Sequence, residues 1–195
     1  MGYFTTIPEN TFQSLQLDAG VLLTTFDPTA TLAAPDDATI ICATTGGIQV
    51  SCVPEYSDLG EDVDNVPANM LELKHLDSWT CTISFTSLST SVAGIQLALG
   101  AADVTGNQVA PRRDLKAADF KDLWWVGDRA DGGAVAVQIK NALSTGGLSI
   151  QSTKSGKGQT SVEITGHVSI NNQDTMPMVF YSIAPPTNSG GGGEG

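Results

Sequence analysis

The sequence predicts a mainly β fold: an antiparallel β-sandwich or open barrel with one α-helix packed against it. Three observations predict it. Several segments alternate apolar and polar residues with a period of two, turn-forming residues separate these segments, and a single segment carries apolar residues at helical spacing. The chain has 195 residues, of which 41% are hydrophobic and 15% charged, a length that suits one domain with a substantial core.

We expect three parts along the chain: an N-terminal arm over residues 1–19, a single domain over residues 20–184, and a flexible glycine-rich tail over residues 185–195. The start of the sequence has neither the basic segment nor the apolar segment of a secretory signal. No stretch approaches the ~20 apolar residues of a membrane span. We therefore expect synthesis in a cytoplasm and no membrane insertion.

The first half of the domain is expected to contain a strand followed by a hairpin. The strand covers residues 20–26 and ends at Asp27-Pro28. The hairpin pairs residues 38–42 with residues 48–53 around the turn Thr45-Gly46-Gly47.

A long acidic connection follows the hairpin, over residues 54–77. Connections of this length inside a compact domain are uncommon and usually functional. We expect it to end in a helical turn near residues 70–76. It is therefore the first segment to consider for a functional contact.

The next segments change period from strand to helix. Residues 78–85 alternate as a strand, with Trp79, Cys81, Ile83 and Phe85 on one face. The apolar residues that follow are spaced by four, three and four positions, which predicts one helix over residues 88–99. Its expected N-cap is Ser89 or Thr90, and its expected end is Gly100 or Gly106.

Residues 120–126 form the next expected strand. Trp124 and Trp125 are adjacent in it, so one indole lies on each face. Large aromatic side chains are enriched both in cores and at interfaces. We predict that one tryptophan belongs to the core and the other lies at a subunit contact; a ligand platform formed by the pair is the alternative.

The last part of the domain, residues 134–183, is expected to form a meander of antiparallel strands. Residues 135–139, 148–150 and 162–170 each alternate between apolar and polar side chains, and turn-forming segments separate them. Each strand therefore has one face for the core and one face for solvent or a partner.

The three cysteines, Cys42, Cys52 and Cys81, are expected to be free thiols that pack as small hydrophobic residues. They form no CxxC pair, and the two histidines, His75 and His167, are far apart in sequence, so no zinc site is expected. A disulfide between Cys42 and Cys52 across the predicted hairpin is the alternative, and it would be unusual in a reducing cytoplasm.

Charge is distributed unevenly along the chain. The net charge is −12, eleven acidic residues precede the first basic one, Lys74, and the other eight basic residues lie between Arg112 and Lys157. This polarity is compatible with simple solubility. It is also compatible with subunits that meet acidic surface to basic surface, or with an acidic surface that repels another polyanion. No basic patch with interleaved aromatic residues indicates a nucleic-acid clamp.

No enzymatic, metal or cofactor site is expected. The string Gly156-Lys157-Gly158 lacks the spacing of a phosphate-binding loop. The acidic run from Asp58 to Asp64 lacks the glycine and glutamate positions of an EF-hand. No GxSxG elbow accompanies the histidines, which argues against a serine nucleophile. We predict that the protein is not an enzyme.

Short stretches spread over residues 38–183 form an ordered set: 43–48 (ATTGGI), 54–58 with 60–65 (PEYSD and GEDVDN), 73–74 with 76–79 (LK and LDSW), 97–103 (LALGAAD), 119–128 (DFKDLWWVGD), 140–147 (KNALSTGG) and 166–167. This set resembles the major tail protein, the tail-tube subunit, of long-tailed, siphovirus-type bacteriophages. The resemblance implies a sandwich with a helix that joins into hexameric rings, which stack into a tube attached to the capsid. The tube is a conduit for double-stranded DNA.

The resemblance also implies partners and contact residues. The partners are other copies of the chain, tape-measure, tail-terminator and tail-tip proteins, and DNA in transit; the location is the virion tail, assembled in the bacterial host cytoplasm. In the family the long loop contacts the next ring. We therefore predict inter-ring contacts at Tyr56, Asp58, Glu61, Asp62 and Asp64, facing Arg112, Arg113 or Lys116. We further expect some of the N-terminal acids to line the lumen and repel phosphates at short range.

Two alternatives stay open. The same fold can build the inner tube of a contractile injection device. A lectin-like binding module belongs to a different class; the free cysteines and the start of the sequence argue against it.

Overall fold

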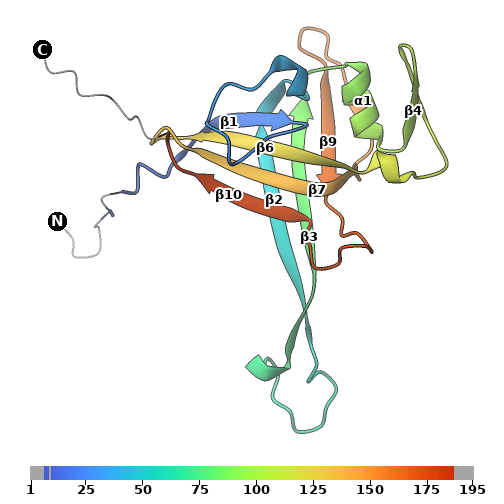
Figure 1. Cartoon of the computed structure of the whole chain (residues 1–195). Helices are drawn as coiled ribbons and strands as arrows, with labels where there is room; N and C mark the ends of the chain where they lie inside the picture. Colours follow the sequence, from blue (N-terminus) through green and yellow to red (C-terminus); the bar gives the residue numbers. More distant parts are fainter. Residues whose placement is uncertain (1–6, 9, 187–195) are drawn as a thin grey trace, which may run out of the picture.

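The computed structural model describes residues 7, 8 and 10–186, so the remaining parts of the expected arm and glycine tail lie outside the described residues. The described residues form two packed antiparallel sheets, one α-helix and three short 3-10 helices (Figure 1). The predicted mainly β sandwich with one helix is confirmed.

The first sheet has the order β1-β6-β7-β10 and runs across the view in Figure 1. Its strands are β1 (Gln16–Leu23), β6 (Lys121–Arg129), β7 (Ala134–Ser144) and β10 (Met178–Ile183). The second sheet stands upright in that view and has the order β2-β3-β9-β8. Its strands are β2 (Thr44–Asp58), β3 (Lys74–Ser87), β9 (Gln159–Thr165) and β8 (Ser149–Gln151). The end of β7 pairs with β9 and joins the two sheets.

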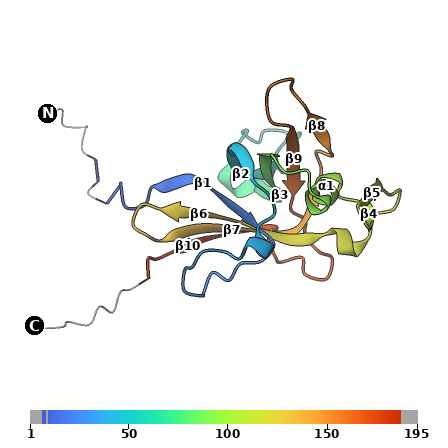
Figure 2. The ribbon, with the colours of Figure 1, turned by 90° about the horizontal axis from the view of Figure 1, so that it is seen from above.

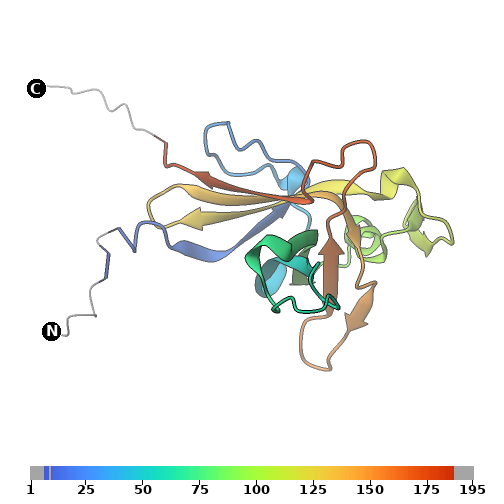
Figure 3. The ribbon, with the colours of Figure 1, turned by 90° about the horizontal axis from the view of Figure 1, so that it is seen from below.

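The remaining elements flank the sheets. They are α1 (Val92–Leu99), the small ribbon of β4 (Ala102–Thr105) and β5 (Gln108–Pro111), and the 3-10 helices η1 (Asp37–Thr39), η2 (Leu71–Leu73) and η3 (Ala117–Asp119). Seen from above and below, the first sheet extends to one side, and α1 with β4 and β5 lies on the other (Figures 2 and 3). The fold therefore has two ends that differ in structure.

The main core fills the space between the two sheets and α1. It consists of alternate residues from both sheets, including Leu22, Cys81, Ile83, Trp125, Val137, Ile139 and Ile164, together with Ala98 of α1. The predicted strand face with Cys81, Ile83 and Phe85 is buried here, whereas Trp79 at its end is 36% exposed.

Trp124 belongs to a second, smaller core on the opposite face of the first sheet. Leu23 and Ala136 are its other buried members, and the rings of Phe26 and Tyr181 lie 5.5 Å from Trp124 between centroids. The predicted subunit contact for the second tryptophan is wrong, because the chain itself covers Trp124 with residues that follow β1 and with β10.

The predicted hairpin between residues 38–42 and 48–53 is wrong. Residues 38–42 contribute only part of η1 and a single bridge from Ile40 to Leu23, whereas β2 pairs along its length with β3. Gly46 and Gly47 have φ values of 77° and 88° and form a bulge inside β2, where the register shifts. Positive φ serves a bulge as well as a turn, so the local glycine signal did not distinguish them. A Cys42–Cys52 disulfide across that hairpin therefore has no support, and all three cysteines are free.

The acidic connection is shorter than predicted, because strands occupy both of its ends. β2 continues to Asp58 and β3 starts at Lys74, so only residues 59–73 form the loop. Pro54 lies inside β2, where an edge strand tolerates it. The predicted helical turn is η2, a 3-10 helix.

Three further boundaries differ from the prediction. β1 begins at Gln16 and ends at Leu23, earlier than expected. The helix starts later, with Ser91 as N-cap; its hydroxyl accepts a hydrogen bond from the Gly94 amide at 3.1 Å. β9 ends at Thr165, and Ile170 beyond it is 83% exposed. Just beyond β9, the Gly166 amide donates a hydrogen bond to the Cys81 carbonyl at 2.9 Å, and an added Cβ at this position would lie 2.7 Å from the Pro177 carbonyl oxygen.

Candidate functional site

The outer face of the second sheet is polar and almost free of charge. Because alternate residues of β3 and β9 enter the core, the residues between them point outward. We call this surface the polar face; it consists of Gln49, Ser51, Val53 and Glu55 of β2, Ser78, Thr80, Thr82, Ser84 and Thr86 of β3, Ser161, Glu163 and Thr165 of β9, and Ser149 and Gln151 of β8. Two of these side chains are carboxylates and none is basic.

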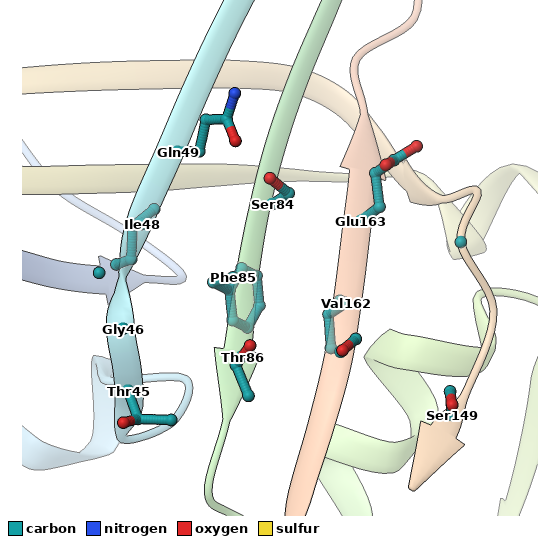
Figure 4. A pocket seen from close by; sticks show the side chains of 13 residues that line it. Thr45, Gly46, Ile48, Gln49, Ser84, Phe85, Thr86, Ser149, Val162 and Glu163 are labelled. Carbon is teal, nitrogen blue, oxygen red and sulfur yellow. The ribbon is translucent and has the colours of Figure 1, made fainter. Parts of the chain in front are cut away.

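A shallow groove of about 510 Å³ crosses the polar face. Gln49, Ser84 and Glu163 lie side by side in one row over three neighbouring strands (Figure 4). At the far end of the face the hydroxyl of Ser78 donates a hydrogen bond to Glu55 at 2.7 Å. These side chains offer hydroxyls, amides and two negative charges, which can hold water and repel an anion but offer no cation to a phosphate.

The two sheets end in strands that have one unpaired edge. Within the described residues β2 pairs only with β3, β8 only with β9, and β10 only with β7. β2 is the longest of them, with 15 residues. An exposed strand edge presents free N–H and C=O groups, which form a template for pairing with another chain.

The second candidate surface is the hairpin arm, which we define as residues 56–77. It projects beyond both sheets (Figure 1). Its apolar side chains are unusually exposed, at 62% for Tyr56 and Leu59 and 83% for Leu71. An exposed apolar patch surrounded by polar residues is typical of a protein interaction site.

Asp58 holds the loop of the hairpin arm together. Its carboxylate accepts hydrogen bonds from the Gly60 and Asn69 amides, both at 3.0 Å, and forms an ion pair with Lys74 at 3.4 Å. The amide hydrogen bonds, from Gly60 first and then Asn69, lower the pKa of Asp58 below its ordinary value of 3.8. Asp58 is therefore a residue that shapes the arm, whereas the exposed Glu61, Asp62 and Asp64 have no ion pair among the described residues.

The order of the hairpin arm is expected to depend on pH through Asp58. Because the pKa is lower in the folded state, the stabilisation is fully present above the unfolded pKa of about 3.9 and is lost as pH falls through the folded value. The amide chemical shifts of Gly60 and Asn69, followed by NMR, should titrate with a midpoint below 3.8. In Asp58→Asn this titration should vanish, and a wild-type midpoint at or above 3.8 would contradict the assignment.

The predicted basic partners lie at the other end of the molecule, in the segment between β5 and η3. Arg112 is already used inside the chain: its side chain is 11% exposed and pairs with Asp119 and with Asp103, the latter at 3.0 Å. Arg113 and Lys116 are exposed, and Lys116 also lies 3.4 Å from Asp103.

The structure thus does not bring the hairpin arm and this basic segment together within one subunit (Figure 1). A contact between them requires two copies of the chain, and the predicted contact residues stay a prediction. Of the N-terminal acids, Glu55 lies on the polar face, whereas Asp36 and Asp37 lie at η1 near the first sheet.

The sequence prediction missed the polar face as a site. The signal was present in residues 78–86, where serine and threonine occupy every second position, opposite the buried residues. What the sequence lacked was the pairing that places this strand between β2 and β9.

In the described part of the chain no three His, Cys, Asp or Glu side chains lie close enough to hold a metal ion. A search of the same residues for a helix that could span a membrane found none.

Comparison with known proteins gave matches only at the level of three-dimensional structure. No known family matches the chain, and no curated protein matches it. One similar structure is described as the tail of an empty gene transfer agent particle with C6 symmetry: identity is 9%, the TM-score is 0.41, and the match covers 77% of this chain and 92% of that chain. Another is the virion of a native gene transfer agent particle: identity is 10%, the TM-score is 0.40, and the match covers 84% of this chain and 95% of that chain. Likeness at this level assigns neither a family nor a function to the chain.

Proposed function

We propose that this chain is the tail-tube subunit of a long-tailed bacteriophage, a structural virion protein that forms hexameric rings which stack into a tube for the passage of double-stranded DNA. The observation that carries the proposal is the polar face: a broad sheet surface without a basic side chain, which ends at the unpaired edge of β2. The ordered sequence stretches within residues 38–183 support the same proposal.

The unpaired strand edges support the proposed ring formation. An exposed edge as long as β2 is an aggregation hazard for a monomer, and pairing with the edge of a neighbouring copy removes it. When the same head-to-tail contact repeats and the rotation closes, the product is a ring. The second sheets of all copies would then join into a barrel, with the polar face turned to the lumen.

The chemistry of the polar face suits such a lumen. Double-stranded DNA carries one negative charge per about 1.7 Å of its axis and binds proteins mainly through Lys and Arg. Glu55 and Glu163 would repel it, with a range near the Debye length of about 8 Å, and the hydroxyl groups would hold a water layer. DNA would slide through the tube without adhering to its wall.

Stacking would use the hairpin arm. Its exposed apolar and acidic side chains reach beyond the sheets and would contact the next ring near Arg113 and Lys116. This axial contact does not close on itself, so it produces a filament of rings.

Electron microscopy tests the proposal. Negative-stain images of the purified full chain, concentrated to the millimolar range, are expected to show rings or tubes with a central hole and sixfold symmetry. Monomers at every concentration, also after addition of tail-tip complexes that would nucleate a tube, would contradict it. A second test uses tubes assembled from the double variant Gln49→Lys with Ser161→Lys, which changes two positions of the polar face on different strands. At 50 mM salt these tubes should retain short double-stranded DNA at least about tenfold better than wild-type tubes.

The matched control is Gln108→Lys with Gln173→Lys. It adds the same charge at exposed positions outside the polar face. If the polar face lines the lumen, the control should retain DNA no better than wild type. Equal retention by both variants would show that the polar face is no different from the rest of the surface.

A further inference from the structure

Cys52 and Cys81 lie directly opposite each other on β2 and β3. Their sulfur atoms are 2.6 Å apart. Directly opposed residues of an antiparallel pair have Cα atoms about 4.5–5.5 Å apart, which falls within the 4.4–6.8 Å range of disulfides. The spacing of the two strands is therefore compatible with a covalent bond between the two sulfurs.

The pair is also accessible. Cys81 is buried, but Cys52 is only partly buried, and both residues line a pocket of about 360 Å³ that is open to the surface. The residues that line it are Cys52, Trp79, Cys81, Met176, Met178 and Phe180. Cys42, the third thiol, belongs to the segment before β2 and is not among them.

We propose that Cys52 and Cys81 form a reversible disulfide that fastens the hairpin arm at its base. The oxidant is a low-molecular-weight disulfide such as oxidised glutathione. The bond would close a loop over residues 53–80, which contains the whole hairpin arm and the end of the β2 edge. Its stabilisation comes mainly from restricting the unfolded chain.

The exchange takes two steps. The Cys52 thiolate attacks one sulfur of oxidised glutathione, which forms a mixed disulfide and releases the first glutathione thiolate. The Cys81 sulfur then attacks the Cys52 sulfur; the bond to glutathione breaks and the second glutathione leaves as a thiolate. The two protein thiols lose two electrons to one oxidised glutathione, and their two protons end on the two glutathione molecules.

The second step is expected to be slow at neutral pH. Burial is the largest cause that raises the pKa of the Cys81 thiol above its ordinary value, and it persists when Cys52 is bonded to glutathione. Since the thiolate is the nucleophile, the rate of closure should rise with pH between 7 and 9.

The stage at which the Cys52–Cys81 disulfide would form rests on the proposed function, whereas the thiol–disulfide exchange itself does not. A tail subunit would assemble with two thiols in a reducing cytoplasm and would meet oxidising conditions after the particle is released. The disulfide would then lock the hairpin arm, and with it the contact between rings.

Counting thiols in the isolated chain tests the proposal whether or not tubes form. The reduced chain, denatured and alkylated, should take up three alkyl groups by mass spectrometry; after incubation with oxidised glutathione it should take up one and stay monomeric on a non-reducing gel. A proteolytic fragment should link Cys52 to Cys81. The unfolding midpoint should rise by about 5–10 °C and return on reduction.

Two variants serve as controls. Cys42→Ser removes the thiol outside the pair, so it should still lose both remaining thiols on oxidation. Cys52→Ser, at the partly buried position, should keep its two thiols, and Cys52→Ala replaces it if the serine variant does not fold. Three alkyl groups on the oxidised wild type, a link through Cys42, or a disulfide-linked dimer would each overturn the proposal.

Discussion

Replacing Trp125 with alanine is expected to destabilise the fold by about 3–5 kcal/mol, which is near the upper end of what a single core substitution costs. The indole is 4% exposed and fills the main core between the two sheets. Its Nε1 group also donates a hydrogen bond to the Ala19 carbonyl at 3.0 Å, which ties β6 to β1. Urea unfolding followed by circular dichroism measures the loss, and the thermal midpoint should fall by about 10 °C or more.

Two other tryptophan variants make the comparison specific. Trp125→Phe keeps most of the volume and loses the hydrogen bond, so a smaller loss of about 1–3 kcal/mol is expected. Trp79→Ala removes the same side chain from a position that is 36% exposed and should cost about 1 kcal/mol. A Trp125→Ala variant as stable as Trp79→Ala would contradict the core assignment.

Reversing two acids of the hairpin arm is expected to abolish tube growth without unfolding the subunit. The variant is Glu61→Lys with Asp64→Lys; Asp62 is avoided because its φ of 65° would strain a lysine. Under the proposed stacking these positions face Arg113 and Lys116 of the next ring, so the reversal replaces attraction with repulsion. Tube mass in a sedimentation assay should fall at least about tenfold, while the unfolding free energy stays within about 0.5 kcal/mol of wild type.

The control and the rescue use charge alone. Asp128→Lys with Asp174→Lys makes the same change at exposed positions away from the arm and should leave tube growth intact. Adding Arg113→Glu and Lys116→Glu to the arm variant should restore tubes, because the charges are exchanged across the contact. Normal tubes from the arm variant without this exchange would disprove the inter-ring assignment.

Local patterns predicted the type of most elements. The alternation in residues 78–85 and 135–139 identified β3 and β7 as strands, and it identified the buried face of β3. The prediction of a single core face was wrong for β7, because Val137 lies in the main core and Ala136 in the second core on the opposite face. The change to helical spacing identified α1, although its first turn was placed too early. The tryptophan pair was correctly assigned to opposite faces of one strand, but the sequence could not show that residues 24–41 and β10 cover the outer indole.

Pairing was the main point where local patterns failed. Gly46 and Gly47 predicted a hairpin turn, and they form a bulge in a 15-residue strand whose partner begins sixteen residues beyond its end. For the same reason, the sequence analysis placed Cys42 opposite Cys52, whereas Cys81 lies there. A residue pattern describes how a strand presents its two faces, and many partners satisfy that description equally well.

Some features of the candidate site could also be predicted from the sequence, and others could not. The acidic composition and the long loop, both read from the sequence, pointed to the hairpin arm. Four features appeared only in the structure: the polar face, the unpaired edges of β2 and β10, the ion pairs of Arg112 within the chain, and the pairing of Cys52 with Cys81.

By itself, then, the sequence determined the fold class, the presence of one helix and the two faces of most strands, because these depend on side-chain periodicity within a few residues. Only the tertiary structure decided which strands pair, which edges stay open and which side chains meet across the sheets. Those outcomes depend on contacts between residues far apart in the chain. The free energy of these contacts is a sum over the whole core, so it cannot be inferred from the residue pattern of any one segment.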